Sequence, residues 1–292
     1  MATPWILVSP ANRGIGYSLT RHLLRTTSLP ILATARLQHD TGEVKASLLG
    51  GLFASDSNES AKASQSHNSR HGNSLAGRLN VVHADVTDEA TLEAAAAQAA
   101  KLFPQSTHHL RLACALPGIL HAEKNLRQVS AADSLESFQV NSVGALLLMK
   151  HFADFLPSRA GPELLVGPDA DADTVRLPGH ATWLSMSARV GSTADNRLGG
   201  WYSYRASKAA VISLAKSLDL SLHVRSGDRA MAVSYHPGTV RTDFSREFWS
   251  GVADEKLFSP GYAAQRLVDV VAGLEIGQRG RCWDWKGEEV PP

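Results

Sequence analysis

The chain has 292 residues, of which 43% are hydrophobic, enough for one large α/β domain or two small ones. Its formal net charge is +1, so the composition indicates no surface for nucleic acid or anionic membranes. The two cysteines, Cys114 and Cys282, exclude a disulfide framework and are expected to be free, buried thiols. The first residues lack the features of a signal peptide, and the longest apolar runs are too short to span a bilayer. We therefore expect a soluble cytoplasmic protein.

Strand-like and helix-like segments alternate along the chain. In chain order, the sequence predicts a strand at 5–9, a helix at 15–26, strands at 30–35 and 80–84, a helix at 87–103, a strand at 110–116, a helix at 134–155, a strand at 182–186, a helix at 201–222, a strand at 230–235, a helix at 260–274 and a last short strand at 280–284. This alternation predicts a parallel sheet with helices on both faces. With right-handed crossovers, the result is a doubly wound, Rossmann-type α/β sheet, expected to form a single domain over residues 1–292.

Two polar stretches interrupt the alternation. Residues 54–78 contain one large apolar side chain, that of Leu75, so they bury too little surface to offset the entropy of ordering. We interpret them as a mobile surface insertion within the domain, because the same pattern resumes at Leu79. Residues 157–179 have the composition of a shorter insertion.

The loop between the first strand and the first helix reads SPANRGIG, residues 9–16. A strand, a glycine-rich turn and a helix point free backbone N–H groups and the positive helix end at a phosphate. Gly14 and Gly16 permit close backbone approach. Pro10 stands where such a turn usually carries its first glycine, and proline cannot adopt a positive φ. The loop therefore suits a phosphate only if φ at this position is negative, and an ordinary turn is the alternative.

Two arginines bear on which dinucleotide the chain would bind. Arg13 lies in the loop, and Arg36 ends the second strand. An acidic residue at the second strand end binds the ribose hydroxyls of NAD, whereas arginine accommodates the 2′-phosphate of NADP. No Asp or Glu occurs from 31 to 39, so the sequence favours NADP(H) over NAD(H). The alternative is that both arginines are solvated surface residues.

Residue types that carry out acid–base chemistry occur near the expected carboxyl edge of the sheet. Tyr204 and Lys208 are four residues apart on one face of a predicted helix, so an ammonium could lower the tyrosine pKa from about 10 toward neutrality. Ser187 follows the fifth strand and could donate a hydrogen bond to a substrate oxygen. Asn141 lies within a predicted helix, which suggests a polar role or a kink. Surface positions for Tyr204 and Lys208 and a satisfied core amide for Asn141 are the alternatives.

These pieces occur together in the order SPANRGIG, Asp85-Val86, Asn141, Ser187, Tyr204-x-x-x-Lys208 and HPGTVRT at 236–242. In this combination the chain resembles a classical short-chain dehydrogenase/reductase over nearly its whole length, apart from the polar insertions. Residues 187–210 and 283–287 resemble the C-factor-like and sniffer-like carbonyl reductase branch. The resemblance implies an NADP(H)-dependent oxidoreductase acting on a small-molecule carbonyl or alcohol. It also implies a homodimer or homotetramer that pairs through residues 134–155 and 201–222.

The resemblance also implies roles for individual residues. Tyr204 would be the general acid or base, Lys208 would lower its pKa and bind the nicotinamide ribose, Ser187 would polarise the substrate carbonyl, and Asn141 would hold a water in a proton relay. Asp85 would contact the adenine. The implied cofactor-binding residues are Ser9, Asn12, Arg13, Gly14, Ile15, Gly16, Arg36, Asp85, Val86, Tyr204, Lys208, Pro237, Gly238, Val240 and Thr242. No metal ligand is implied, and the sequence has no metal-binding spacing such as HExxH.

Two departures from the family pattern lie beside the expected cofactor path. Pro10 replaces the first glycine, and residues 115–118 read Ala-Leu-Pro-Gly where the family usually has Asn-Asn-Ala-Gly. They leave open a non-enzymatic NADP(H)-binding regulator on the same fold.

The segment after the sixth strand, residues 243–259, is the expected substrate-facing loop. It contains four large aromatic residues, Phe244, Phe248, Trp249 and Phe258. They suggest an apolar or aromatic carbonyl substrate. The packing of a lid or of an interface is the alternative.

Overall fold

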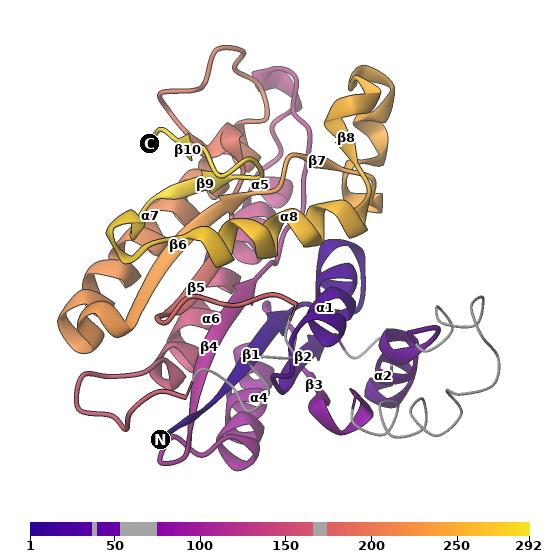
Figure 1. Cartoon of the computed structure of the whole chain (residues 1–292). Coiled ribbons are helices and arrows are strands. Elements are labelled where there is room, and N and C mark those ends of the chain that lie inside the picture. The colour runs from indigo at the N-terminus through magenta and orange to yellow at the C-terminus, as the bar shows by residue number, and fades with distance from the viewer. Residues whose placement is uncertain (37–39, 53–74, 166–173) are drawn as a thin grey trace.

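The structure of the protein is a computed structural model that describes residues 1–36, 40–52, 75–165 and 174–292 (Figure 1). Its main sheet has eight strands in the order β10-β9-β6-β5-β4-β1-β2-β3. The strands are β1 Thr3–Ser9, β2 Ile31–Ala35, β3 Leu79–His83, β4 His108–Ala115, β5 Ala181–Met186, β6 Ala230–His236, β9 Cys282–Asp284 and β10 Glu289–Val290. Neighbouring strands are parallel, except that β10 pairs antiparallel with β9. The predicted doubly wound parallel sheet is confirmed.

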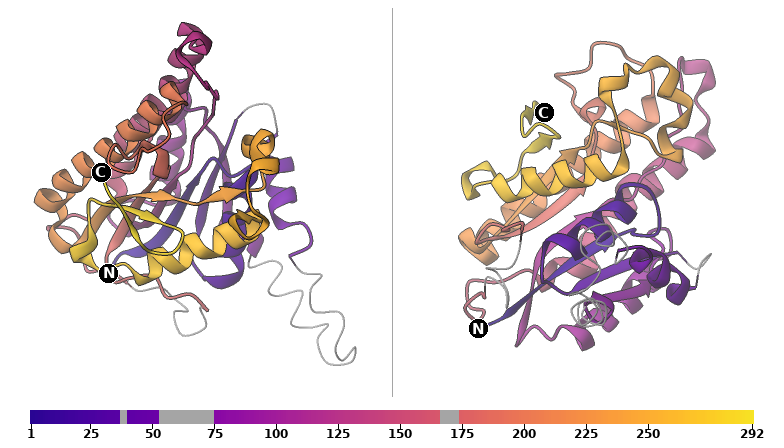
Figure 2. Two further views of the ribbon diagram at one scale, coloured as in Figure 1. Left: turned by 90° about the horizontal axis from the view of Figure 1, so that it is seen from above. Right: turned by 45° about the vertical axis from the view of Figure 1, so that its right-hand side comes forward.

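Helices cover both faces of this sheet (Figure 2). On one face lie α1 (Gly14–Thr26), α2 (Thr41–Leu49) and α8 (Pro260–Gly273), whose apolar side chains share one core cluster. On the other face lie α4 (Glu89–Leu102), α6 (Gly144–Phe152) and α7 (Tyr202–Ser226), which contribute to a second cluster. Two short strands, β7 (Thr239–Val240) and β8 (Leu257–Phe258), form a separate parallel pair.

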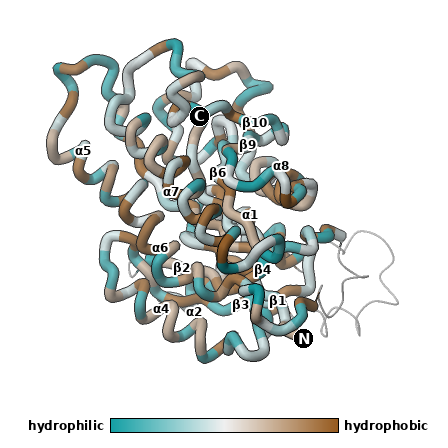
Figure 3. The backbone as a smooth tube through the Cα atoms, turned by 90° about the vertical axis from the view of Figure 1, so that its left-hand side faces the viewer, coloured by the Kyte–Doolittle hydropathy of each residue, from teal (hydrophilic) through white to brown (hydrophobic). Residues whose placement is uncertain are grey.

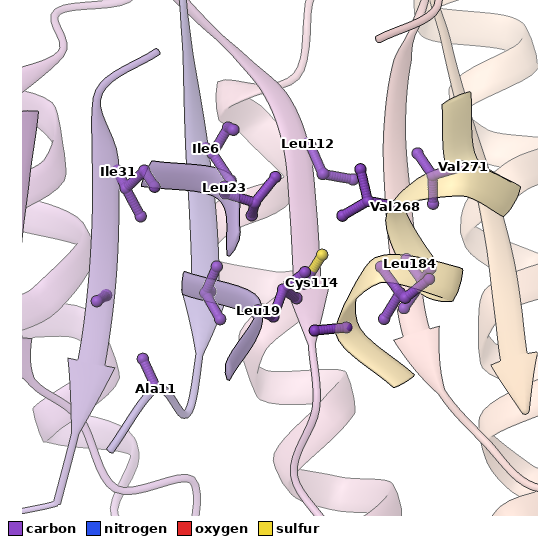
Figure 4. Close-up of a cluster of buried hydrophobic side chains, with 14 of the residues drawn as sticks. Ile6, Ala11, Leu19, Leu23, Ile31, Leu112, Cys114, Leu184, Val268 and Val271 are labelled. Atoms are coloured by element: carbon purple, nitrogen blue, oxygen red, sulfur yellow. The ribbon is translucent and has the colours of Figure 1, made fainter. Parts of the chain in front are cut away.

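The core between the sheet and the first helix layer explains the apolar runs in the sequence. Figure 4 shows Leu19 and Leu23 of α1 beside Ile6 of β1, and Val268 of α8 facing Leu184 of β5. Strands buried on both faces read as continuous apolar segments, because neither face can be polar. Figure 3 shows hydrophobic segments in the central strands and hydrophilic ones along the outer loops. Cys114 and Cys282 are both buried and unpaired, as expected.

The long helix expected at 134–155 is present with an irregularity at its centre. α5 (Ala131–Phe138) runs through a π-helical turn, Gln139–Val143, directly into α6. Asn141 lies in this turn and is fully buried. The poor helix propensity of asparagine thus marks a distortion of the helix, as the sequence suggested.

Four of the described α-helices and strands were not predicted, namely α2, β10 and the short paired strands β7 and β8. α2 buries only Val44 and Leu48, so its apolar pattern is too sparse to indicate a helix. β10 has two residues, with one side chain buried. α7 ends at Ser226, four residues beyond its expected end. No helix in the described ranges is both long enough and apolar enough to cross a bilayer.

The two predicted polar insertions fall partly outside the described residues, namely at 53–74 and 166–173. The described ends of both stretches are anchored. Leu75 packs against the first core cluster, and the Arg78 guanidinium donates hydrogen bonds to the carbonyls of Thr27 and Leu24 at the end of α1. Val175 and Leu177 pack against the same cluster.

Candidate active site

The predicted site residues gather at the carboxyl edge of the main sheet, where open α/β sheets bind ligands. The strand order reverses beside β1, which lies between β2 and β4. The loop after β1, the segment after β4, the end of β5 and the segment after β6 all start from this edge. α7 adds its first two turns, which carry Tyr204 and Lys208.

The loop after β1 accommodates proline at its first position. The Ser9–Pro10 peptide is cis, and the left-handed residue of the loop is Gly14, with φ +55°. A Cβ added at Gly16 would lie 1.9 Å from the carbonyl oxygen of Pro10. Glycine is therefore required at position 14 by the backbone conformation and at position 16 by close packing. Position 10 has neither requirement, so proline fits there.

The start of α1 is open to an anion. Its N-cap residue, Arg13, makes no side-chain capping hydrogen bond, and the first turn contains no acidic residue. The N–H groups of the first turn have no partners within the helix, and the helix dipole adds positive potential there. Thr242 lies across from this turn, since its Cγ2 is 3.5 Å from the Cβ position of Gly14. These features fit the pyrophosphate of a dinucleotide.

Ser9 does not fit its implied role as a cofactor contact. It is 1% exposed, and its hydroxyl accepts a hydrogen bond of 2.8 Å from Thr34 Oγ1. Its carbonyl accepts from the N–H of Leu116 at 2.6 Å. Ser9 therefore joins β1 to the neighbouring strand and to the segment after β4, and its buried side chain has no surface for a ligand.

Asp85 and Arg36 lie near each other at the ends of β3 and β2, where the adenosine half of a dinucleotide would lie. Partial burial raises the pKa of the Asp85 carboxyl, but the hydrogen bonds from the Thr87 N–H and hydroxyl, with the charge of Arg36, lower it overall. Val86 packs against the start of α6, because a Cβ at Gly144 would lie 2.7 Å from its Cβ. Val86 thus limits how α6 approaches this edge.

The segment after β6 turns sharply before it reaches Thr242. Gly238 has φ +77°, and a Cβ there would lie 2.6 Å from Cε2 of Phe258. Only glycine suits both the conformation and the space. Pro237 and Val240 are buried, and the Val240 carbonyl accepts a hydrogen bond from Ser245. The turn therefore aims Thr242 at the glycine loop.

Tyr204 and Lys208 form a buried pair. The Lys208 ammonium donates hydrogen bonds to the carbonyls of Met186 (3.0 Å) and Pro117 (3.3 Å) and lies 5.9 Å from the Tyr204 ring centroid. Burial lowers the pKa of Lys208 to about 7 and raises the pKa of Tyr204 above its usual range. The expected lowering of the tyrosine pKa is therefore absent in this state, because desolvation of the buried hydroxyl raises the pKa. Tyr204 instead keeps its proton at neutral pH.

The departure at residues 115–118 does not remove support for the lysine. The carbonyl that accepts from Lys208 belongs to Pro117. A Cβ at Gly118 would lie 3.3 Å from Lys208 Nζ, so glycine leaves room for the ammonium beside this segment. The backbone therefore supplies the lysine contact that this segment makes.

Asn141 is a fully satisfied buried amide. Its Oδ1 accepts from the N–H of Ile119 (2.8 Å), and its Nδ2 donates to the Ile119 carbonyl (3.0 Å) and to Ser207 Oγ (2.9 Å). Both amide donors are used, so this side chain has only the second lone pair of Oδ1 left for the water of a proton relay. Its observed contacts connect the segment after β4 to α7.

Ser187 is turned toward α7. It is 2% exposed, and its hydroxyl donates a 2.9 Å hydrogen bond to the backbone carbonyl of Lys208. The implied polarisation of a substrate carbonyl by Ser187 does not fit this geometry, because its proton is already engaged. Ser185, two residues earlier, lies in β5 and is buried.

Sequence reasoning missed Glu123, which supports the start of α7. Its side chain is 3% exposed, and its carboxylate accepts from the N–H of Ser203 at 3.3 Å. Its backbone carbonyl accepts from the N–H of Trp201 at 2.6 Å. A glutamate in an irregular segment nearly eighty residues before the helix leaves no periodic signal, so only the fold could reveal this contact.

Comparisons with known proteins identify relatives of this chain. No family model matches the chain. Over 166 residues it is 31% identical to the C-signal protein of Myxococcus xanthus, covering 57% of this chain and 82% of the relative. It is 25% identical over 222 residues to the short-chain dehydrogenase srdF of Neurospora crassa, covering 73% and 76%.

Solved structures share the fold. The carbonyl reductase Sniffer of Drosophila melanogaster has a TM-score of 0.71 at 21% identity, and the NADPH-bound carbonyl reductase from chicken fatty liver has 0.70 at 22% identity. Both comparisons cover the whole of each chain. The chain belongs to the short-chain dehydrogenase/reductase family.

Proposed function

We propose that the protein is an NADP(H)-dependent oxidoreductase that transfers a hydride between the nicotinamide and a carbonyl or alcohol substrate. The observation that carries the proposal is the buried Tyr204–Lys208 pair at the carboxyl edge of the sheet. The carbonyl reductases among the structural relatives, one of them bound to NADPH, support the same reaction class.

The residues of this chain fit the proposed cofactor at each of its parts. The open first turn of α1 would hold the pyrophosphate, and Arg36, with the exposed Arg13, would bind the 2′-phosphate. Asp85 would lie toward the adenine, and Lys208 toward the nicotinamide ribose. When bound, the cofactor supplies the hydride, while the protein supplies orientation and electrostatics.

Tyr204 is the proposed proton donor in the reductive direction. Its hydroxyl is protonated near neutral pH and can give that proton to the oxygen of a carbonyl. Because burial raises its pKa, this transfer depends on stabilisation of the phenolate that forms. Lys208, held by two backbone carbonyls, would stabilise the phenolate that remains. In the oxidative direction, the same phenolate would take the alcohol proton.

The test is NADPH oxidation with an aldehyde by the wild type, Tyr204→Phe and the control Tyr202→Phe. Tyr202 is 39% exposed and has no lysine four residues later. We expect Tyr204→Phe to lose roughly 10²- to 10⁴-fold in kcat, the usual contribution of a general acid, with NADPH affinity unchanged. Equal turnover in Tyr204→Phe and Tyr202→Phe would contradict the role of Tyr204. NADPH binding without turnover in the wild type would favour the non-enzymatic regulator.

The remaining expectations are part of the same proposal. We propose that the chain folds as one domain, which the single large sheet supports. Apolar side chains exposed on α5, α6 and α7 support homo-oligomer formation through these helices, namely Leu135, Leu146, Leu220 and Val224. The buried free thiols support a cytoplasmic location.

A further inference from the structure

Three aromatic side chains from two segments of the chain gather beside Tyr204. The Trp201 ring lies 6.2 Å from the Tyr204 ring in an edge-to-face arrangement, with an interplanar angle of 72°. The Phe244 ring centroid lies 6.0 Å from that of Tyr204, and the Phe248 ring centroid lies 4.9 Å from that of Trp201. We call Trp201, Phe244 and Phe248 the aromatic cluster.

The other two aromatic residues of the 243–259 segment are directed elsewhere. Trp249 stacks with the guanidinium groups of Arg241 and Arg246, at 5.8 and 5.9 Å, and donates its indole N–H to Ser245. Phe258 packs against Tyr262 and Trp285. The segment therefore places Phe244 against Tyr204 and Phe248 against Trp201, whereas its other two aromatic residues contact neither.

Trp201 is held at this position by an uncommon backbone conformation. Its φ is +50°, and among the described residues it is the only non-glycine with a positive φ. Gly199 and Gly200 before it have φ of +65° and +67°, and its N–H is bonded to the Glu123 carbonyl. A bulky residue in the left-handed region is rare and tends to occur at functional sites. The chain therefore fixes an indole next to Tyr204 at a conformational cost.

The aromatic cluster faces the same space as the proton donor and the lysine. The Cβ position of Gly118 lies 3.3 Å from Lys208 Nζ and 3.7 Å from Phe244 Cε2. Phe244 is 42% exposed, so part of its ring is free for a ligand. A substrate whose carbonyl oxygen reaches Tyr204 would bring its substituent against these rings.

We infer that Trp201 is a specificity-determining residue and that the aromatic cluster binds an aryl group attached to the substrate carbonyl. The inference rests on the proposed function, because it places the carbonyl at Tyr204. Aryl aldehydes and ketones are the expected substrate class. Their flat rings make offset or edge-to-face contacts with Trp201 and Phe248, which a flexible alkyl chain cannot reproduce.

The experiment compares 2-naphthaldehyde with hexanal as substrates for NADPH-dependent reduction. The variants are Trp201→Leu and Phe248→Leu, and the matched control is Trp249→Leu, whose ring lies against Arg241 and Arg246. We expect each cluster variant to lower kcat/KM for 2-naphthaldehyde by roughly three- to tenfold, the loss of one aromatic contact, with hexanal nearly unchanged. Trp249→Leu should retain the wild-type ratio between the two substrates.

A binding measurement separates this inference from the proposed function. The fluorescence of 2-naphthalenemethanol, titrated with each protein, reports on the aromatic cluster without turnover. Weaker binding by Trp201→Leu and Phe248→Leu than by Trp249→Leu supports the inference, even if the wild type reduces neither aldehyde and the proposed function fails. Equal binding by all three variants, or equal losses of activity on both aldehydes, would overturn it.

Discussion

The tightest contact in the glycine loop gives a direct test of how that loop is built. A Cβ at Gly16 would lie 1.9 Å from the Pro10 carbonyl oxygen, about 1 Å inside the 3.0 Å that real Cβ contacts respect. Gly16→Ala must therefore move the start of α1 away from the loop by about that distance. Overpacking of this kind usually costs about 1–3 kcal/mol of stability. A displacement of about 1 Å at a binding site can cost as much as about a hundredfold in activity.

The assay compares Gly16→Ala with Gly273→Ala by urea unfolding and by NADPH titration. Gly273 ends α8, and an added Cβ there meets nothing within 4 Å, so alanine should be tolerated. We expect Gly16→Ala to lower the unfolding free energy by the stated amount and to weaken NADPH binding at least tenfold. If Gly16→Ala matched Gly273→Ala in both measurements, the packing of α1 against Pro10 would be refuted.

Two further predictions concern the buried hydrogen bond of Ser187 and the buried imidazole of His109. Ser187→Ala should lower the unfolding free energy by about 1 kcal/mol, the contribution of one buried hydrogen bond. Its kcat/KM should stay within roughly fivefold of the wild type. A loss of activity as large as that of Tyr204→Phe would show that Ser187 acts on the substrate. His109 is 3% exposed, and burial lowers its pKa from 6.5 to about 4. It stays neutral in the folded protein while the unfolded chain binds a proton, so stability falls as pH drops from 6.5 to 4. Unfolding measurements between pH 6.5 and 4 should show that His109→Gln reduces this loss of unfolding free energy by up to about 3 kcal/mol. An equal effect of His108→Gln would contradict the assignment of the loss to His109.

The sequence was sufficient for the fold because its long elements carry strong periodic signals. Each strand of the central parallel sheet is a short apolar run bounded by turn residues, and each long helix has an apolar face. The elements that were missed, α2, β7, β8 and β10, bury at most two side chains each, too few to create such a pattern. The sheet order then follows from alternation and the handedness of crossovers.

The candidate site was only partly predictable, because side-chain partners depend on tertiary packing. The spacing of Tyr204 and Lys208 indicated a pair, and the structure places both at the sheet edge. That Ser187 and Asn141 have hydrogen bonds to α7 could not be read from their positions in the chain. The same holds for Trp201, whose place beside Tyr204 depends on a left-handed backbone conformation.

The most direct test of the central claim is fluorescence titration of the purified protein with NADPH and with NADH. We expect micromolar affinity for NADPH and weaker binding of NADH, because the Pro10 loop is open to a pyrophosphate and Arg13 and Arg36 favour a 2′-phosphate. Tighter binding of NADH would contradict the arginine assignment. No binding of either cofactor would contradict the proposed oxidoreductase activity as a whole.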